Sequence, residues 1–284
     1  MALPQTQDQT AARYQTIVLQ SLASLSEGDT RSRTLHRLRI HLRRLQAYLQ
    51  LIGADLSADM IAKCVSRLSR LRTWQVFERY VERLHDSGSD LRKVRDRVEK
   101  TRLKLREKDA YGQIKGLVLT STSPSALAAS SSVSHRLAAL RMLNAESLAE
   151  LIDKARVKPR RRRLHALRLK IKTIRYQEEW ALREHDPRPG LVERLKDAQD
   201  VLGEYEDLAE FRKLARLLSL ECRQQITRDW RRVRKRARAL PAELSRLSHA
   251  LSRRRLRLVG SQSRAARTSL RSLEGTRGDA HPPS

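Results

Sequence analysis

Two segments of the chain, HRLRIHLRRLQ at residues 36–46 and HALRLKIKTIR at residues 165–175, match each other at a separation of 129 residues. Leu38 aligns with Leu167, and in both segments the apolar residues recur at steps of three and four. This spacing places the apolar side chains on one face of a helix, where they can pack against neighbouring helices. The repeat therefore predicts two equivalent amphipathic helices, far apart in the sequence, in an all-α fold.

A row of mostly cationic side chains accompanies the apolar face in each segment. The first segment carries His36, Arg39, Arg43 and Gln46, and the second carries His165, Arg168, Lys172 and Arg175. At about 100° per residue, each set falls within a stripe roughly 80° wide. Like charges one turn apart repel each other, at a cost of about a few tenths of a kcal/mol per pair. Two such rows side by side would form a basic groove that attracts an anionic partner.

The segments that follow the two motif helices also correspond. Residues 68–77 match residues 202–211 at a separation of 134, so the second half contains five additional residues before this point. We place the insertion at the Pro-Arg-Pro-Gly turn of residues 187–190, because Pro and Gly interrupt helices.

Helical spacing continues through most of the remaining chain, and no segment shows the alternation that is typical of a β-strand. One continuous charged helix is expected over residues 90–118. Clusters of Gly, Pro and Ser set the expected boundaries. We expect residues 1–10 to be an N-terminal leader, 11–119 the first helical bundle, 120–134 a Ser-rich linker, 135–257 the second helical bundle and 258–284 a basic disordered tail.

The chain is strongly basic. Its 284 residues include 60 Lys and Arg against 32 Asp and Glu, which gives a formal net charge of +28. Of the basic residues 47 are Arg, whose planar guanidinium keeps its charge and matches the oxygen atoms of phosphate. With 3 Trp, 6 Tyr and 2 Phe, the chain has too few aromatic residues for many base-stacking platforms. The composition favours a phosphate-bearing partner.

Several classes of protein are disfavoured by the sequence. Cys64 and Cys222 are isolated, so neither a disulfide framework nor a structural zinc site is expected. No apolar run approaches the roughly 20 residues of a membrane-spanning helix, and the N-terminus does not resemble a secretory signal. No phosphate-binding glycine loop, metalloprotease motif or nucleophile elbow occurs. We therefore expect a cytoplasmic binding protein with no membrane partner, no cofactor, no metal and no enzymatic activity.

The motif helix, present twice, and the residues after its second copy resemble the CHAD domain family. The resemblance rests on the pattern H-x-x-R-x-x-x-[RK] in both halves and on Leu195, Lys196, Gln199, Asp200, Leu202, Gly203 and Asp207. It covers roughly residues 11–257 and implies two antiparallel four-helix bundles, related by an internal pseudo-two-fold, with a basic groove between them. Members of the family bind inorganic polyphosphate and several associate with polyphosphate granules, so the resemblance implies this ligand and this location.

The candidate polyphosphate-binding residues come from the two motif helices and from a basic run before the second. Residues 158–163 read KPRRRR, and cations at the start of a helix are unfavourable unless an anion is nearby. The full candidate set is His36, Arg39, Arg43, Arg44, His165, Arg168, Lys172, Arg175, Arg161 and Arg162. Thr73 stands where family members usually have an acidic residue in the first half, whereas Asp207 keeps it in the second half, in position to orient neighbouring cations.

Three questions stay open at the level of the sequence. The two motif histidines either contact phosphate or form hydrogen bonds between helices, and metal binding is a third role for them. The basic runs at residues 231–238 and 253–257 either extend the anion-binding surface or form a solvated helix face. The partner expected is polyphosphate, with nucleic acid as a weaker polyanion. The alternative functions are nonspecific nucleic-acid binding and a granule-coating scaffold that recruits other proteins.

Overall fold

The three-dimensional structure is a computed structural model. It describes residues 7–84, 88–127, 133–184 and 189–245. Every secondary-structure element in these ranges is a helix, which confirms the expected all-α fold. The predicted tail at residues 258–284 lies outside the described residues. None of the described helices combines the length and the apolar character that crossing a membrane requires.

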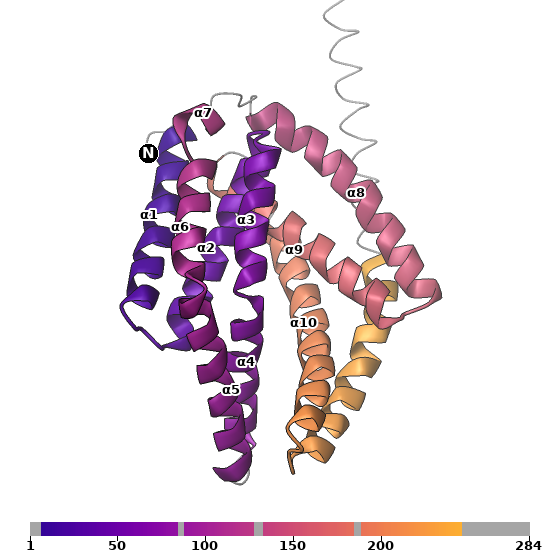
Figure 1. Ribbon diagram of the computed structural model, residues 1–284. Coiled ribbons are helices and arrows are strands. Elements are labelled where there is room, and N and C mark those ends of the chain that lie inside the picture. Colours follow the sequence, from indigo (N-terminus) through magenta and orange to yellow (C-terminus); the bar gives the residue numbers. More distant parts are fainter. Residues whose placement is uncertain (1–6, 85–87, 128–132, 185–188, 246–284) are drawn as a thin grey trace, which may run out of the picture.

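Seven helices lie in the described part of the first half (Figure 1). They are α1 (Gln7–Ser26), α2 (Ser32–Leu51), α3 (Asp55–Arg67), α4 (Ser69–Arg83), α5 (Gly88–Glu107), α6 (Ala110–Ser121) and α7 (Pro124–Leu127). The short helix α7 falls within the stretch expected to be a linker. The first motif segment lies on α2, as the periodicity predicts.

The second half follows the same order with fewer breaks. Its described helices are α8 (Val133–Val157), α9 (Arg161–Glu184), α10 (Pro189–Leu217) and a helix over residues 223–245. The second motif segment lies on α9. The continuous helix α10 corresponds in the repeat to α3 and α4 together, which are divided at Leu68. The internal two-fold relation of the halves stays a prediction from the repeat.

The charged helix expected over residues 90–118 is divided into α5 and α6. Between them Asp109 adopts a left-handed backbone conformation with φ of 44°. Its side chain accepts a hydrogen bond from the backbone N–H of Gly112 at 3.2 Å and so caps the first turn of α6. Asp tolerates this conformation because its short polar side chain bonds locally to the backbone. The expectation of one continuous helix is therefore wrong at this point.

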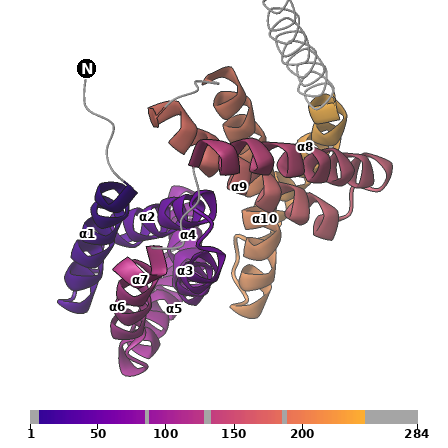
Figure 2. The same cartoon turned by 90° about the horizontal axis from the view of Figure 1, so that it is seen from above.

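The two halves lie on opposite sides of the molecule (Figure 2), and ring contacts mark where they pack together. Near the C-terminal ends of α2 and α9, the ring centroids of Tyr48 and Trp180 lie 6.1 Å apart. Where α4 meets α10, the rings of Phe77 and Phe211 are stacked with centroids 4.9 Å apart. These two phenylalanines occupy equivalent positions of the repeat. A large hydrophobic core cluster, with buried residues from both halves, joins the two bundles.

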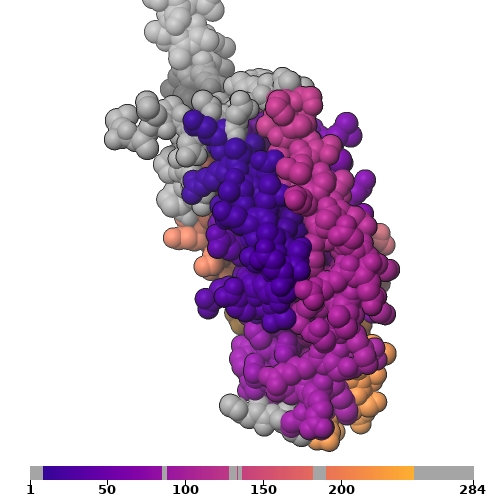
Figure 3. All heavy atoms as spheres, turned by 60° about the vertical axis from the view of Figure 1, so that its left-hand side comes forward, coloured from indigo at the N-terminus to yellow at the C-terminus, as the bar shows by residue number. Residues whose placement is uncertain are grey.

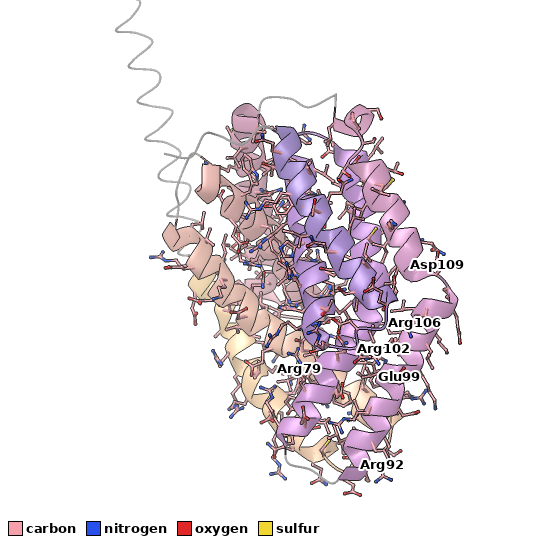
Figure 4. The ribbon with its side chains drawn as sticks, turned by 90° about the vertical axis from the view of Figure 1, so that its left-hand side faces the viewer. Arg79, Arg92, Glu99, Arg102, Arg106 and Asp109 are labelled. Carbon is pink, nitrogen blue, oxygen red and sulfur yellow. The ribbon has the colours of Figure 1, made fainter. Side chains whose placement is uncertain are left out.

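Helices α1, α5 and α6 form a closed outer face of the first half (Figure 3). Two arginines of α5, labelled in Figure 4, stabilise this face. Arg102 and Arg106 donate hydrogen bonds to the backbone oxygens of Thr30 and Ser26, both at 3.2 Å, near the turn between α1 and α2. These cations hold the fold together at a distance from the motif helices.

Candidate anion-binding site

The motif helices α2 and α9 separate apolar from cationic residues as the repeat predicts. The completely buried residues include Leu35, Leu38, Leu42 and Leu45 on α2, and Leu167 and Ile171 on α9. The motif cations of α2 precede Tyr48, and those of α9 precede Trp180, the residues at which these helices meet. The cationic residues of both helices therefore lie between this contact and the place where α4 meets α10.

Arg39 is held in place by hydrogen bonds to the junction of α3 and α4. Its Nη1 donates to the backbone oxygen of Val65 at 2.7 Å and to Oγ of Ser69 at 3.1 Å. Burial lowers the pKa of Arg39 to about 10, and the charges of Arg43 and Arg72 contribute to the same shift. Arg39 thus has a fixed position but no carboxylate partner among the described residues.

Lys172 on α9 lies among cations from both halves. Desolvation lowers its pKa from the usual 10.5 to about 6, and the positive charges of Arg43, Arg168 and Arg39 act in the same direction. Two of these three arginines belong to α2, so the two motif helices place their charges close to one amine. Within the described ranges, no carboxylate forms an ion pair with Lys172. The fold therefore holds several mutually repelling cations together.

Arg43 and Arg168 face this group from α2 and α9. Burial is the largest cause of the lowered pKa of Arg43, and the charge of Arg168 also lowers it. The guanidinium of Arg168 lies against Gly203 of α10, where an added Cβ would be 3.6 Å from its Nε. This Nε is buried and has no hydrogen-bond partner in the described part of the chain. Arg168 therefore packs against α10 at Gly203 with a donor that no described residue uses.

Arg72 and Arg79 of α4 extend the group, although the sequence did not mark them as candidates. Burial lowers the pKa of Arg72 to about 10, as does the charge of Arg79, which Figure 4 labels. The Nη1 of Arg72 is buried and finds no hydrogen-bond partner among the described residues. Burial and these two arginines also lower the pKa of His36. We define the central cationic cluster as His36, Arg39, Arg43, Arg72, Arg168 and Lys172.

A carboxylate of α10, Asp207, acts on the central cationic cluster. Desolvation raises the pKa of Asp207, whereas the charges of Arg168, Arg72 and Lys172 lower it, and the pKa remains above its usual range. The side chain is nevertheless exposed to solvent. A carboxylate can be desolvated and still exposed when one side of it is open to water and protein atoms surround its other sides. Asp207 offsets only part of the positive charge.

Two of the sequence candidates, Arg44 and Arg175, share a carboxylate partner. Arg175 forms an ion pair with Glu179, one turn further along α9, and donates a hydrogen bond to Gln199 at 3.0 Å. Arg44 approaches the same carboxylate from α2, at 3.9 Å. The guanidinium of Arg175 also lies over the ring of Tyr176, 4.4 Å from its centroid. The charges of both arginines are therefore partly compensated inside the fold.

The start of α9 has its own ion-pair network. Arg161 pairs with Glu206 at 2.7 Å and with Glu210 at 3.2 Å, and Nδ1 of His165 lies 3.5 Å from Glu206. Arg162 is exposed and forms no ion pair in the described ranges. The candidates that the structure gathers into one group are His36, Arg39, Arg43, Arg168 and Lys172. The others lie at its margin with carboxylate partners or, for Arg162, on the surface.

The sequence pattern of the CHAD domain matches residues 11–216, well over half of the chain. The chain belongs to the CHAD domain family. A solved structure, the CHAD domain from the plant Ricinus communis, is similar with a TM-score of 0.64 and 18% sequence identity, over 86% of this chain and 90% of the plant domain. At this identity the likeness shows a shared fold. A comparison with curated proteins returned no match.

The two halves of this CHAD domain differ at the position of Arg72. In the repeat Arg72 corresponds to Glu206, so the first half adds a cation where the second half has a carboxylate that pairs with Arg161. Thr73 corresponds to Asp207 and donates its hydroxyl to the backbone of its own helix. This reversal of charge at an aligned position is the signal in the sequence by which Arg72 could have been found.

Proposed function

We propose that this CHAD domain binds inorganic polyphosphate at the central cationic cluster and does not catalyse a reaction. The observation that carries the proposal is Lys172, whose pKa is lowered to about 6 by burial and by nearby arginines from both halves. Holding desolvated like charges together is unfavourable unless a counter-charge joins them. An anionic ligand would supply that charge, and the free N–H groups of Arg72 and Arg168 would supply hydrogen bonds.

A chain of phosphates suits this arrangement better than a single phosphate does. His36, Arg39 and Arg43 follow one another at about one turn, roughly 5 Å, along α2. Asp207 is exposed and yet desolvated, as a side chain inside a groove would be. This environment supports a groove between the halves, with the central cationic cluster along its walls. A flexible polyanion in such a groove contacts several cations, and the release of its counterions contributes to the affinity. Association with polyphosphate granules would follow from this binding.

The test of the proposal is a competition between polyphosphate and DNA. We expect polyphosphate to displace a fluorescent duplex, and the duplex not to displace polyphosphate, at equal phosphate concentration and fixed salt. The physical reason is that a narrow row of cations suits a thin, flexible chain, whereas Tyr176, an aromatic residue that acts on Arg39 and Arg43, is buried and cannot stack on bases. Equal displacement in both directions would favour the nucleic-acid alternative, and release of phosphate during incubation would show catalysis.

The affinity for polyphosphate is expected to fall as the pH rises from 7 to 9. In the free protein Lys172 is mostly neutral above pH 6, because desolvation and the charges of Arg43, Arg168, Arg39 and Arg175 lower its pKa. Asp207 opposes this shift from α10 only in part. Bound phosphate raises the Lys172 pKa, so binding takes up a proton over this range, and the affinity changes by up to about tenfold per pH unit.

Two variants check the assignment of this pH dependence. Lys172→Arg keeps a charge at every pH in the range, so its affinity should be nearly constant between pH 7 and 9. Lys196→Arg, at an exposed position of α10, should keep the wild-type slope. Calorimetric titration at fixed ionic strength measures both. A slope that survives unchanged in Lys172→Arg would remove Lys172 from the binding site.

A further inference from the structure

A recess lies on the second half of the molecule, between the end of α10 and the helix of residues 223–245. Its volume is about 530 Å³, which is within the usual range of small-ligand sites. The residues that line it are Arg212, Arg216, Arg223, Gln224, Thr227, Arg228 and Arg231. We call this recess the outer arginine pocket. Five of its lining residues are arginines, and none is a carboxylate.

The outer arginine pocket is separate from the central cationic cluster. Arg212 follows Asp207 by five positions on α10, so the two side chains leave the helix in directions about 140° apart. Residues 223–231 also lie beyond the segment that matches the family pattern, residues 11–216. Arg212 and Arg216 lie within the matched segment, so the pocket straddles its C-terminal end.

Among the described residues, no carboxylate forms an ion pair with an arginine of the pocket. Arg212 lies over the ring of Trp230, 4.0 Å from its centroid, and its buried Nε has no hydrogen-bond partner in the described part of the chain. The nearby charges that act on Arg212 are those of Arg216, Arg231 and Arg234. Two arginines of the helix over residues 223–245 that lie outside the pocket do pair with carboxylates. Arg232 pairs with Asp229 at 3.5 Å, and Arg236 pairs with Glu204 at 3.9 Å.

The chemistry of this group indicates its ligand. Guanidinium forks bind phosphate through paired hydrogen bonds, and the amide of Gln224 adds a neutral donor at the same recess. We propose that the outer arginine pocket binds a compact ligand with several adjacent phosphate groups, of the oligophosphate class, independently of the central cationic cluster. Such a ligand is either a free oligophosphate or the far end of a longer chain.

The fluorescence of Trp230 reports ligand binding at the outer arginine pocket. A ligand that draws Arg212 away from the ring changes the fluorescence of Trp230, and Trp230→Phe identifies this part of the signal. Inorganic tripolyphosphate is titrated into a protein whose central cluster carries Arg43→Gln, Arg168→Gln and Lys172→Gln. We expect saturable binding and a Trp230 response in this background.

The pocket variant replaces Arg216, Arg228 and Arg231, all exposed, with Ala, which leaves Arg212 on the reporter ring. We expect its affinity for tripolyphosphate to fall by at least about tenfold, since each charged hydrogen bond contributes roughly that factor. The charge-matched control replaces three exposed arginines, Arg33, Arg92 and Arg97, with Ala, and should bind as tightly as its parent.

The outcomes separate the two proposals. A response to tripolyphosphate without the central cluster supports a free oligophosphate, and a response to long chains alone that persists without the central cluster supports the end of a longer chain. A response that is lost with the central cluster overturns independent binding at the pocket. Absence of any Trp230 response to either ligand, or an unchanged affinity in the pocket variant, overturns the pocket. Equally tight binding of hexaglutamate overturns the phosphate assignment in favour of an acidic peptide. If the pocket variant still binds long chains at the central cationic cluster, the proposed function stands, whichever of these results is obtained for the pocket.

Discussion

Replacing Arg43, Arg168 and Lys172 together with Gln is expected to weaken binding of long-chain polyphosphate by about a thousandfold or more. Each charged hydrogen bond contributes about 1.5 kcal/mol or more, and about 1.4 kcal/mol corresponds to a factor of ten in affinity. All three residues lie on the motif helices; the charges of Arg43 and Arg168 act on Lys172, and that of Arg168 acts on Arg43. Calorimetric titration of the variant at fixed salt measures the loss. Arg39 is left in place because its hydrogen bonds stabilise the fold.

Salt dependence and a control distinguish a lost site from a lower overall charge. If three phosphate contacts disappear, the slope of log affinity against log salt should become shallower by about 2, by analogy with single-stranded nucleic acids. The control changes Arg33, Arg92 and Arg97 to Gln. These residues are exposed and form no ion pair within the described ranges, so the control has the same net charge but an intact cluster. Equal losses in both proteins would mean that net charge alone attracts the polymer.

Lys172→Met is expected to raise the stability of the unliganded protein. The folded protein holds the Lys172 proton less tightly than the unfolded chain does, because burial and adjacent arginines lower its pKa to about 6. The folded state is therefore penalised fully below pH 6, and the penalty fades as the pH approaches the unfolded value of 10.5. We expect a gain of about 1 kcal/mol or more at pH 6, or roughly 2–4 °C in Tm.

The pH dependence of Tm identifies the cause of this stabilisation. The difference in Tm between Lys172→Met and wild type should narrow from pH 6 to pH 9, because the wild-type penalty decreases over this range. Lys196→Met removes an exposed lysine of α10 and should change Tm little at any pH. Scanning calorimetry without ligand gives the Tm values of the wild type, Lys172→Met and Lys196→Met at each pH. A lower Tm for Lys172→Met would show that the Lys172 amine stabilises the fold.

The fold and much of the site could be predicted from the sequence because both depend on periodicity. The leucines of α2 and the cations beside them recur with the period of a helix, and periodicity decides which side of a helix is buried. The same repeat predicted that Arg39 and Lys172, although far apart in sequence, would lie in one group. The packing of α2 against α9 confirms that these helices are neighbours.

The remaining features depend on contacts between helices and on local backbone conformation. Glu179 compensates Arg44 and Arg175, and no spacing rule connects Arg44 on α2 with a carboxylate on α9. Arg72 joins the cluster because α4 packs against the other half, which periodicity within α4 does not show. The end of α5 depends on the left-handed conformation of Asp109, a local preference that the surrounding helical pattern concealed.

The most direct test is to measure affinity and stability on the same preparation of the Arg43→Gln, Arg168→Gln, Lys172→Gln protein. If these cations are kept together for an anionic ligand, removing them should weaken the binding of long-chain polyphosphate by about a thousandfold and raise Tm in the absence of ligand. Opposite changes of the two quantities are the predicted result. Retention of wild-type affinity, or a fall in Tm together with the loss of binding, would contradict it.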